Sequence, residues 1–207
     1  MKQNKINKKF VYLISPNKIK NQNFYNNLAL VLSSGKISFF QLRLKEETNL
    51  NKLIIGKKIK KICKKYKVKF LINDDPLLAQ KLNADGCHLG QKDMDVLEAR
   101  KILKNKIIGV TCHNSINLAK RANEAGADYL AFGAFYASKT KIVKYRANLK
   151  ILKSVKKITS LPIVAIGGIK LSNYKKLLLN KANFLAISGY IWNNKKYKPL
   201  EAIKKLK

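Results

Sequence analysis

Acidic residues are scarce in this chain of 207 residues, which has 44 lysines and arginines against 11 aspartates and glutamates. The resulting formal charge of +33 attracts polyanions, so nucleic acid is the first class of partner to consider. Arginine is itself scarce, although proteins that bind bases and phosphates usually rely on its bidentate guanidinium. Lysines scattered through predicted helices are typical of a solvated surface, and we therefore expect no nucleic-acid partner.

Cysteines and long apolar runs are few as well. The cysteines have neither CxxC nor metal-ligand spacing, which predicts buried or idle thiols in a reducing, cytoplasmic compartment. They are Cys63, Cys87 and Cys112. Apolar runs fall short of the roughly 20 residues that a membrane helix requires, so no membrane partner is expected. The first apolar run ends at Ser15-Pro16, which indicates a strand and not the core of a signal peptide.

Short apolar, β-rich runs alternate with amphipathic segments along the chain, and no linker divides it. The runs cover residues 10–15, 38–44, 68–73, 86–90, 107–112, 129–135, 162–168 and 184–190. Helical patterns between them cover 50–66, 116–125, 147–158 and 171–180. This alternation predicts an α/β fold, a single-domain (β/α)8 TIM barrel over residues 1–207, with a doubly wound open sheet as the alternative.

Polar and glycine residues follow the predicted strands, whose carboxyl ends meet at one rim of such a barrel and carry its active site. They are Gln41, Arg43, Lys45, Asn73, Asp74, Asp93, Thr111, His113, Ser138, Thr140, Lys141, Gly167, Gly168, Ser188 and Gly189. Glycines that close the last two strands are typical of phosphate binding through backbone N–H groups, or of a turn alone. We assign no role to His113.

The rim contains two carboxylates, Asp74 and Asp93, next to several cations. Mg²⁺ takes one or two protein carboxylates, retains water and binds phosphate oxygens, so this pair predicts a magnesium site. A helix cap is the alternative for Asp74. For Asp75, which precedes Pro76, a helix cap is the better interpretation. His88 lies within a strand and is predicted to be a core histidine.

The segment "FQLRLK" places polar and apolar residues in alternation. Alternate side chains of a strand share a face, so Gln41, Arg43 and Lys45 are predicted to point together into the barrel. Such buried polar groups are costly unless they bind something. Their neighbours suit contact with an outer helix instead; these are Phe39, Phe40, Leu42 and Leu44.

Together with "LIND", "ADGCHLGQKD", "IGVTCH", "GADYLAFGAF", "VAIGGI" and "AISG", this segment resembles the thiamine-phosphate synthases, in order from about Val11 to Trp192. The resemblance implies a (β/α)8 barrel and a transferase of alkyl or aryl groups. Its small-molecule substrates would be hydroxymethylpyrimidine diphosphate and thiazole phosphate, with Mg²⁺ as the cofactor. The oligomeric state is not implied.

The resemblance also implies residue roles. Mg²⁺ would be bound by Asp74 and Asp93. Substrate-binding residues would be Gln41, Leu42, Arg43, Leu44, Lys45, Asn73, Thr111, Ser138, Lys139, Thr140, Lys141, Gly168, Ile187 and Ser188. Among them, Arg43, Lys45 and Lys141 would stabilise the leaving diphosphate, and Thr111, which stands where the family often has serine, would contact it. Ser138, Lys139 and Thr140 match the loop that touches the thiazole phosphate. The family loop is usually Pro-Thr-x-Thr-Lys, and Ala137-Ser138-Lys139-Thr140-Lys141 departs from it.

Two other functions remain in consideration. Thiazole tautomerases share the barrel but generally lack the full diphosphate and metal set, which is present here. A basic protein that binds nucleic acid without catalysis is the other alternative, and it would bind less tightly as salt rises.

Overall fold

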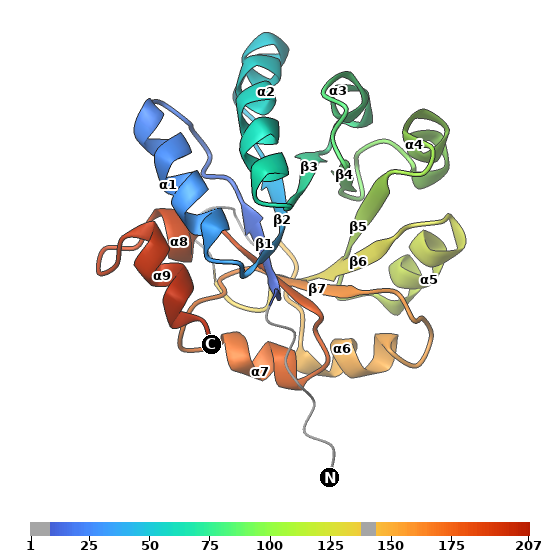
Figure 1. Ribbon diagram of the computed structural model, residues 1–207. Helices are drawn as coiled ribbons and strands as arrows, with labels where there is room; N and C mark the ends of the chain where they lie inside the picture. Colours follow the sequence, from blue (N-terminus) through green and yellow to red (C-terminus); the bar gives the residue numbers. More distant parts are fainter. Residues whose placement is uncertain (1–8, 138–143) are drawn as a thin grey trace.

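All eight apolar runs form strands in the computed structural model, which describes residues 9–137 and 144–207. The strands are β1 (Val11–Ile14), β2 (Ile37–Leu42), β3 (Lys69–Asn73), β4 (Gly86–Leu89), β5 (Ile107–His113), β6 (Tyr129–Phe132), β7 (Ile163–Ile166) and β8 (Phe184–Ile187). Each pairs in parallel with the next, and β8 pairs with β1, which closes the barrel (Figure 1). The predicted barrel is confirmed and the open sheet was wrong.

Helices surround the barrel on its outside (Figure 1). They are α1 (Gln22–Ser33), α2 (Asn49–Lys65), α3 (Pro76–Lys81), α4 (Val96–Leu103), α5 (Ile116–Glu124), α6 (Leu149–Val155), α7 (Tyr174–Leu179), α8 (Gly189–Trp192) and α9 (Pro199–Lys205). Several begin at a side chain that accepts a backbone N–H bond, such as Thr48 before α2 and Ser115 before α5. Within the described residues, no helix is long and apolar enough to span a membrane.

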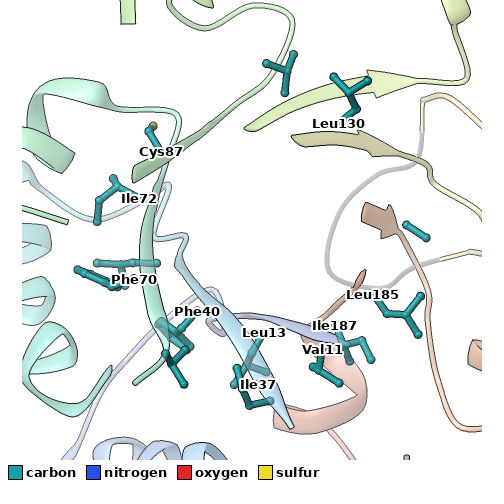
Figure 2. Packing of buried hydrophobic residues seen from close by; sticks show 14 of the residues in the cluster. Val11, Leu13, Ile37, Phe40, Phe70, Ile72, Cys87, Leu130, Leu185 and Ile187 are labelled. Carbon is teal, nitrogen blue, oxygen red and sulfur yellow. The ribbon is translucent and has the colours of Figure 1, made fainter. Parts of the chain in front are cut away.

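Alternation along the strands separates two apolar clusters. One face of each strand packs against the helices, as Figure 2 shows for residues such as Leu13, Phe70 and Ile72. The opposite face fills the barrel interior; this inner cluster contains Tyr12, Leu71, Tyr129, Ala131, Val164 and Ala186. The three cysteines are free thiols and are buried, as predicted.

Phe39 corrects one expectation from the sequence, because it lies on the inner face with Gln41. Its ring centroid is 5.4 Å from that of Tyr12 and 5.0 Å from that of Phe184. The strand period of two requires this placement: Phe39 and Gln41 are two residues apart and share a face, whereas Phe40 and Leu42 face outward. The polar rim is therefore supported from below by a layer of aromatic rings.

Gly109 on β5 provides the space for one of these rings. A methyl group at this position would overlap the ring of Tyr129 on neighbouring β6. The backbone of Gly109 is outside the left-handed region, so room for the ring is what requires a glycine.

Gly109→Ala is expected to lower the melting temperature by several degrees. Overpacking a core costs roughly 1–3 kcal/mol, and each kcal/mol shifts Tm by roughly 2–4 °C in a chain of this size. Thermal unfolding followed by circular dichroism measures the change. An unaltered Tm would show that the Tyr129 ring has room to move.

Candidate active site

The segment after β2 brings two cations to the rim. Gln41 belongs to the strand and is buried, and its amide nitrogen donates to Asn73 Oδ1 on β3 at 2.7 Å. The strand ends at Leu42, so Arg43 and Lys45 lie beyond it at the rim, which corrects the prediction of three polar groups along one strand face inside the barrel. Ser15 holds this turn in place, because its Oγ accepts the Arg43 N–H bond at 2.9 Å.

A pocket of about 230 Å³ opens beside this segment. Its lining combines polar groups from the rim with apolar side chains beneath them: Leu42, Leu44, Lys45, Lys52, Ile72, Asn73, Asp74, Asp75 and Leu78. Leu42 and Leu44 are each 3% exposed, so their side chains serve as packed wall and their part in substrate binding stays a prediction.

Asp74 follows β3 and is fixed by one backbone contact and one side-chain contact. Its backbone N–H donates to the His88 carbonyl at 2.8 Å, which continues the β3–β4 pairing by one residue. Its φ of 65° lies in the left-handed region, and its Oδ2 forms an ion pair with Lys45 Nζ at 2.8 Å. The next residue, Asp75, caps α3 as predicted, since its Oδ1 accepts the Leu78 N–H bond at 2.8 Å.

Asp93 turns back toward Asp74 from the loop after β4. Its Oδ2 accepts the Gly90 N–H bond at 2.6 Å, which closes the loop. Burial raises the pKa of Asp93, and a hydrogen bond with the Asp74 carboxyl group raises it further. Burial acts in the same direction on Asp74, but hydrogen bonds from Lys45 and Asp93 outweigh it, so the pKa of Asp74 is lowered. The carboxyl groups of Asp74 and Asp93 therefore lie within reach of each other, and their binding of Mg²⁺ stays a prediction.

The donor set of this pair fits a hard divalent cation. Two carboxyl groups in contact repel each other when both are ionised, unless a proton or a cation lies between them. Within residues 9–137 and 144–207, no group of three or more His, Cys, Asp and Glu side chains gathers in a metal-binding arrangement. A cation at Asp74 and Asp93 would therefore complete its coordination shell with water or substrate oxygens, as Mg²⁺ usually does in proteins.

His88 and Thr111 are joined across β4 and β5. His88 Nε2 lies 2.8 Å from Thr111 Oγ1, and His88 Nδ1 lies 2.8 Å from the hydroxyl oxygen of Tyr129. This confirms His88 as a core histidine. His113 ends β5, as predicted, and its ring stacks on Tyr145 with 4.1 Å between centroids.

The ends of β7 and β8 have the predicted turn residues. Gly167 and Gly168 both have positive φ, and a methyl group on Gly168 would overlap the carbonyl oxygen of Ala137. Ile187 has a buried side chain, and the hydroxyl of Ser188 donates to the Ser15 carbonyl at 3.0 Å. Their phosphate contacts therefore stay a prediction that rests on backbone groups.

The remaining predicted site residues, Ser138, Lys139, Thr140 and Lys141, lie outside the described residues.

Sequence reasoning missed three residues of the rim. Ser15 supports Arg43 and Ser188, and Asn17 Oδ1 accepts a hydrogen bond from the Arg43 guanidinium at 3.3 Å. Both follow β1, so the rule that strand ends carry the site would have found them. Lys52 lines the pocket from α2, but nothing in the sequence separates it from the other lysines.

The closed parallel barrel and its polar rim place this chain in the class of TIM barrels, whose enzymes carry their sites at the carboxyl ends of the strands. The family model described as thiamine monophosphate synthase matches residues 11–191, and the chain belongs to that family.

Similar proteins agree with this assignment. A thiamine-phosphate synthase of Pelagibacter ubique is 88% identical over 207 residues, which is 100% of both chains. A thiamine-phosphate synthase of Nitrosomonas eutropha is 39% identical over 184 residues, covering 88% of this chain and 86% of the relative. Among solved structures, a thiamine phosphate pyrophosphorylase from Pyrococcus furiosus has a TM-score of 0.85 at 26% identity, covering 98% of this chain and 96% of that one.

Proposed function

We propose that this chain is a Mg²⁺-dependent thiamine-phosphate synthase. It joins hydroxymethylpyrimidine diphosphate to thiazole phosphate and releases diphosphate. The observation that carries the proposal is the meeting of Asp74 and Asp93 beside Lys45, at the rim of a barrel that belongs to this family. A cation-binding carboxylate pair next to lysine and arginine suits a diphosphate better than any neutral substrate.

The reaction requires the protein to stabilise the leaving diphosphate. The CH₂–O bond of the pyrimidine substrate breaks, its electron pair leaves with the diphosphate, and the thiazole nitrogen forms the new bond to the CH₂ carbon. Arg43 and Lys45 face the negative charge that develops on the departing oxygens, and Lys141 is predicted to join them. Mg²⁺ bound at Asp74 and Asp93 would supply Lewis-acid neutralisation of the same charge.

Gln41 and Asn73 orient the pyrimidine ring. The hydrogen bond between their amide groups fixes both side chains before any ligand arrives. Their remaining amide atoms then offer a donor and an acceptor to the ring. Holding two substrates in this way contributes roughly 7–11 kcal/mol in the best model systems, so no side-chain nucleophile is required.

The direct test is to incubate the purified protein with both phosphorylated halves and Mg²⁺ and to measure thiamine phosphate by chromatography. We expect product to form, excess EDTA to abolish it, and added Mg²⁺ to restore it. A tautomerase would form no thiamine phosphate from these substrates and would not depend on Mg²⁺. Product formation that persists in EDTA would contradict the metal assignment while leaving the synthase activity in place.

A further inference from the structure

A chain of hydrogen bonds runs through the barrel interior to the rim. The hydroxyl oxygens of Tyr12 and Tyr129 are 2.8 Å apart, and Tyr129 contacts His88 Nδ1. His88 Nε2 then contacts the hydroxyl of Thr111, which is partly exposed at the rim. Four polar side chains on β1, β6, β4 and β5 thus form one line from the core to the site.

The inner end of this chain is closed. Tyr12 is 1% exposed and packs within the apolar inner cluster defined above. Among the described residues, its hydroxyl group has the hydroxyl of Tyr129 as its hydrogen-bond partner. Burial raises the pKa of both tyrosines, so both hydroxyl groups keep their hydrogens at neutral pH. The hydrogen of Tyr12 must therefore point to Tyr129, or it has no acceptor.

Because the hydroxyl hydrogen of Tyr12 can point only to Tyr129, it sets the donor and acceptor of every other hydrogen bond in this series. If Tyr12 donates to Tyr129, then Tyr129 donates its own hydrogen to His88 Nδ1, and His88 carries its hydrogen on Nε2. Nε2–H in turn donates to the hydroxyl oxygen of Thr111, which leaves the hydroxyl hydrogen of Thr111 pointing away from His88. All buried hydrogens then have an acceptor.

The reverse direction fails at Tyr12. If Thr111 donated to Nε2, His88 would carry its hydrogen on Nδ1, Tyr129 would donate to Tyr12, and the Tyr12 hydrogen would be buried without a partner. A doubly protonated imidazole leaves the same orphan hydrogen. A buried unsatisfied donor costs about 1–3 kcal/mol, which is enough to select one direction.

We propose that His88 is a positioning residue, held as the Nε2–H tautomer, that turns the hydroxyl hydrogen of Thr111 outward to donate to the substrate diphosphate. The inference rests on the proposed function and on the diphosphate contact that the resemblance to thiamine-phosphate synthases implies for Thr111. A hydroxyl fixed in this way offers an anion a donor that needs no reorientation when charge develops.

Packing keeps the imidazole in the required orientation. The rings of His88 and Tyr129 stack with 5.6 Å between centroids and 17° between planes. Gly109 leaves the room that the Tyr129 ring occupies. Ring position, tautomer and hydroxyl direction are therefore set by the barrel before any substrate binds.

Nitrogen-15 NMR of histidine-labelled protein tests the tautomer without any assay of activity. We expect a protonated Nε2 and an unprotonated Nδ1 for His88, assigned by comparison with His88→Gln. Protonation at Nδ1 would overturn the proposal, whether or not the protein makes thiamine phosphate.

The functional arm uses Tyr129→Phe with Tyr12→Phe as its matched control, because each variant removes one buried hydroxyl group. Tyr129→Phe releases His88 Nδ1 and lets the imidazole adopt either tautomer, so we expect diphosphate to bind about five- to tenfold more weakly. In Tyr12→Phe, Tyr129 becomes the innermost hydroxyl group and still donates its hydrogen to His88 Nδ1. The diphosphate Kd of this variant is therefore expected to stay within about twofold of the wild-type value.

Thr111→Val distinguishes positioning from a general loss of structure. In the Thr111→Val background, Tyr129→Phe is expected to have no further effect on diphosphate Kd, because the hydroxyl it acts through is gone. An equal loss in both backgrounds, or an equal loss in Tyr12→Phe, would overturn the proposal. Wild-type protein that forms no thiamine phosphate would refute the proposed function alone, since Kd and tautomer are measured separately.

Discussion

Asp74→Asn is expected to lower the turnover of thiamine-phosphate synthesis at least about a hundredfold, with the fold intact. A metal that neutralises a phosphoryl oxygen contributes several kcal/mol to the transition state, and each 1.36 kcal/mol is a factor of ten in rate. Asparagine takes away the charge that holds both the cation and the Lys45 ammonium group. Steady-state rates at saturating substrates and a titration of Mg²⁺ measure the loss.

The conformation of Asp74 makes asparagine the informative replacement. Its φ of 65° is a conformation that asparagine tolerates about as well as aspartate, so the variant removes charge without adding backbone strain. Asp75→Asn is the matched control, because it removes the neighbouring carboxylate. Asparagine caps a helix as well as aspartate does, so the N-terminus of α3 keeps its cap. Equal turnover in the two variants would contradict the assignment of Asp74 to the metal site.

Positions at strand ends are what the sequence predicts well in this fold. A parallel strand is buried on both faces, so the run from Phe70 to Ile72 is apolar, and the first polar residues after it are Asn73 and Asp74. This change from apolar to polar residues can be read directly from the sequence. The barrel then brings β3 and β4 side by side, and Asp74 meets Asp93 without any further signal in the sequence.

Contacts across strands are what the sequence leaves open. Phe39 is a different case, because the strand period already places it on the face of Gln41, and the expectation that it faces outward with the equally apolar Phe40 neglects that period. The bond from His88 to Thr111 depends on β4 and β5 pairing with His88 opposite Gly109, and no local pattern specifies that register. Lys52 reaches the pocket through the geometry of α2, while the sequence shows one lysine among many.

Arg43→Gln is expected to reduce kcat/KM for the pyrimidine diphosphate roughly a hundredfold or more, the usual cost of removing one donor that faces developing charge. Arg43 suits this role because its surroundings place it accurately. Ser15 holds its backbone on both sides, with Oγ accepting from Arg43 N at 2.9 Å and donating to Arg43 O at 3.3 Å. Asn17 then directs the guanidinium.

Burial lowers the pKa of Arg43, and the charge of Asp74 acts against this shift, so the guanidinium lies within electrostatic reach of the Asp74 carboxylate. Arg43→Lys is expected to recover only a small part of the loss, because an ammonium group cannot make the planar, two-pronged contact with phosphate oxygens. Arg121→Gln on α5 removes the same charge from a position away from the rim and controls for the effect of net charge on substrate attraction. If Arg121→Gln and Arg43→Gln lose activity alike, the protein attracts its substrate through its overall field. If Arg43→Gln alone loses it, the rim itself stabilises the leaving group.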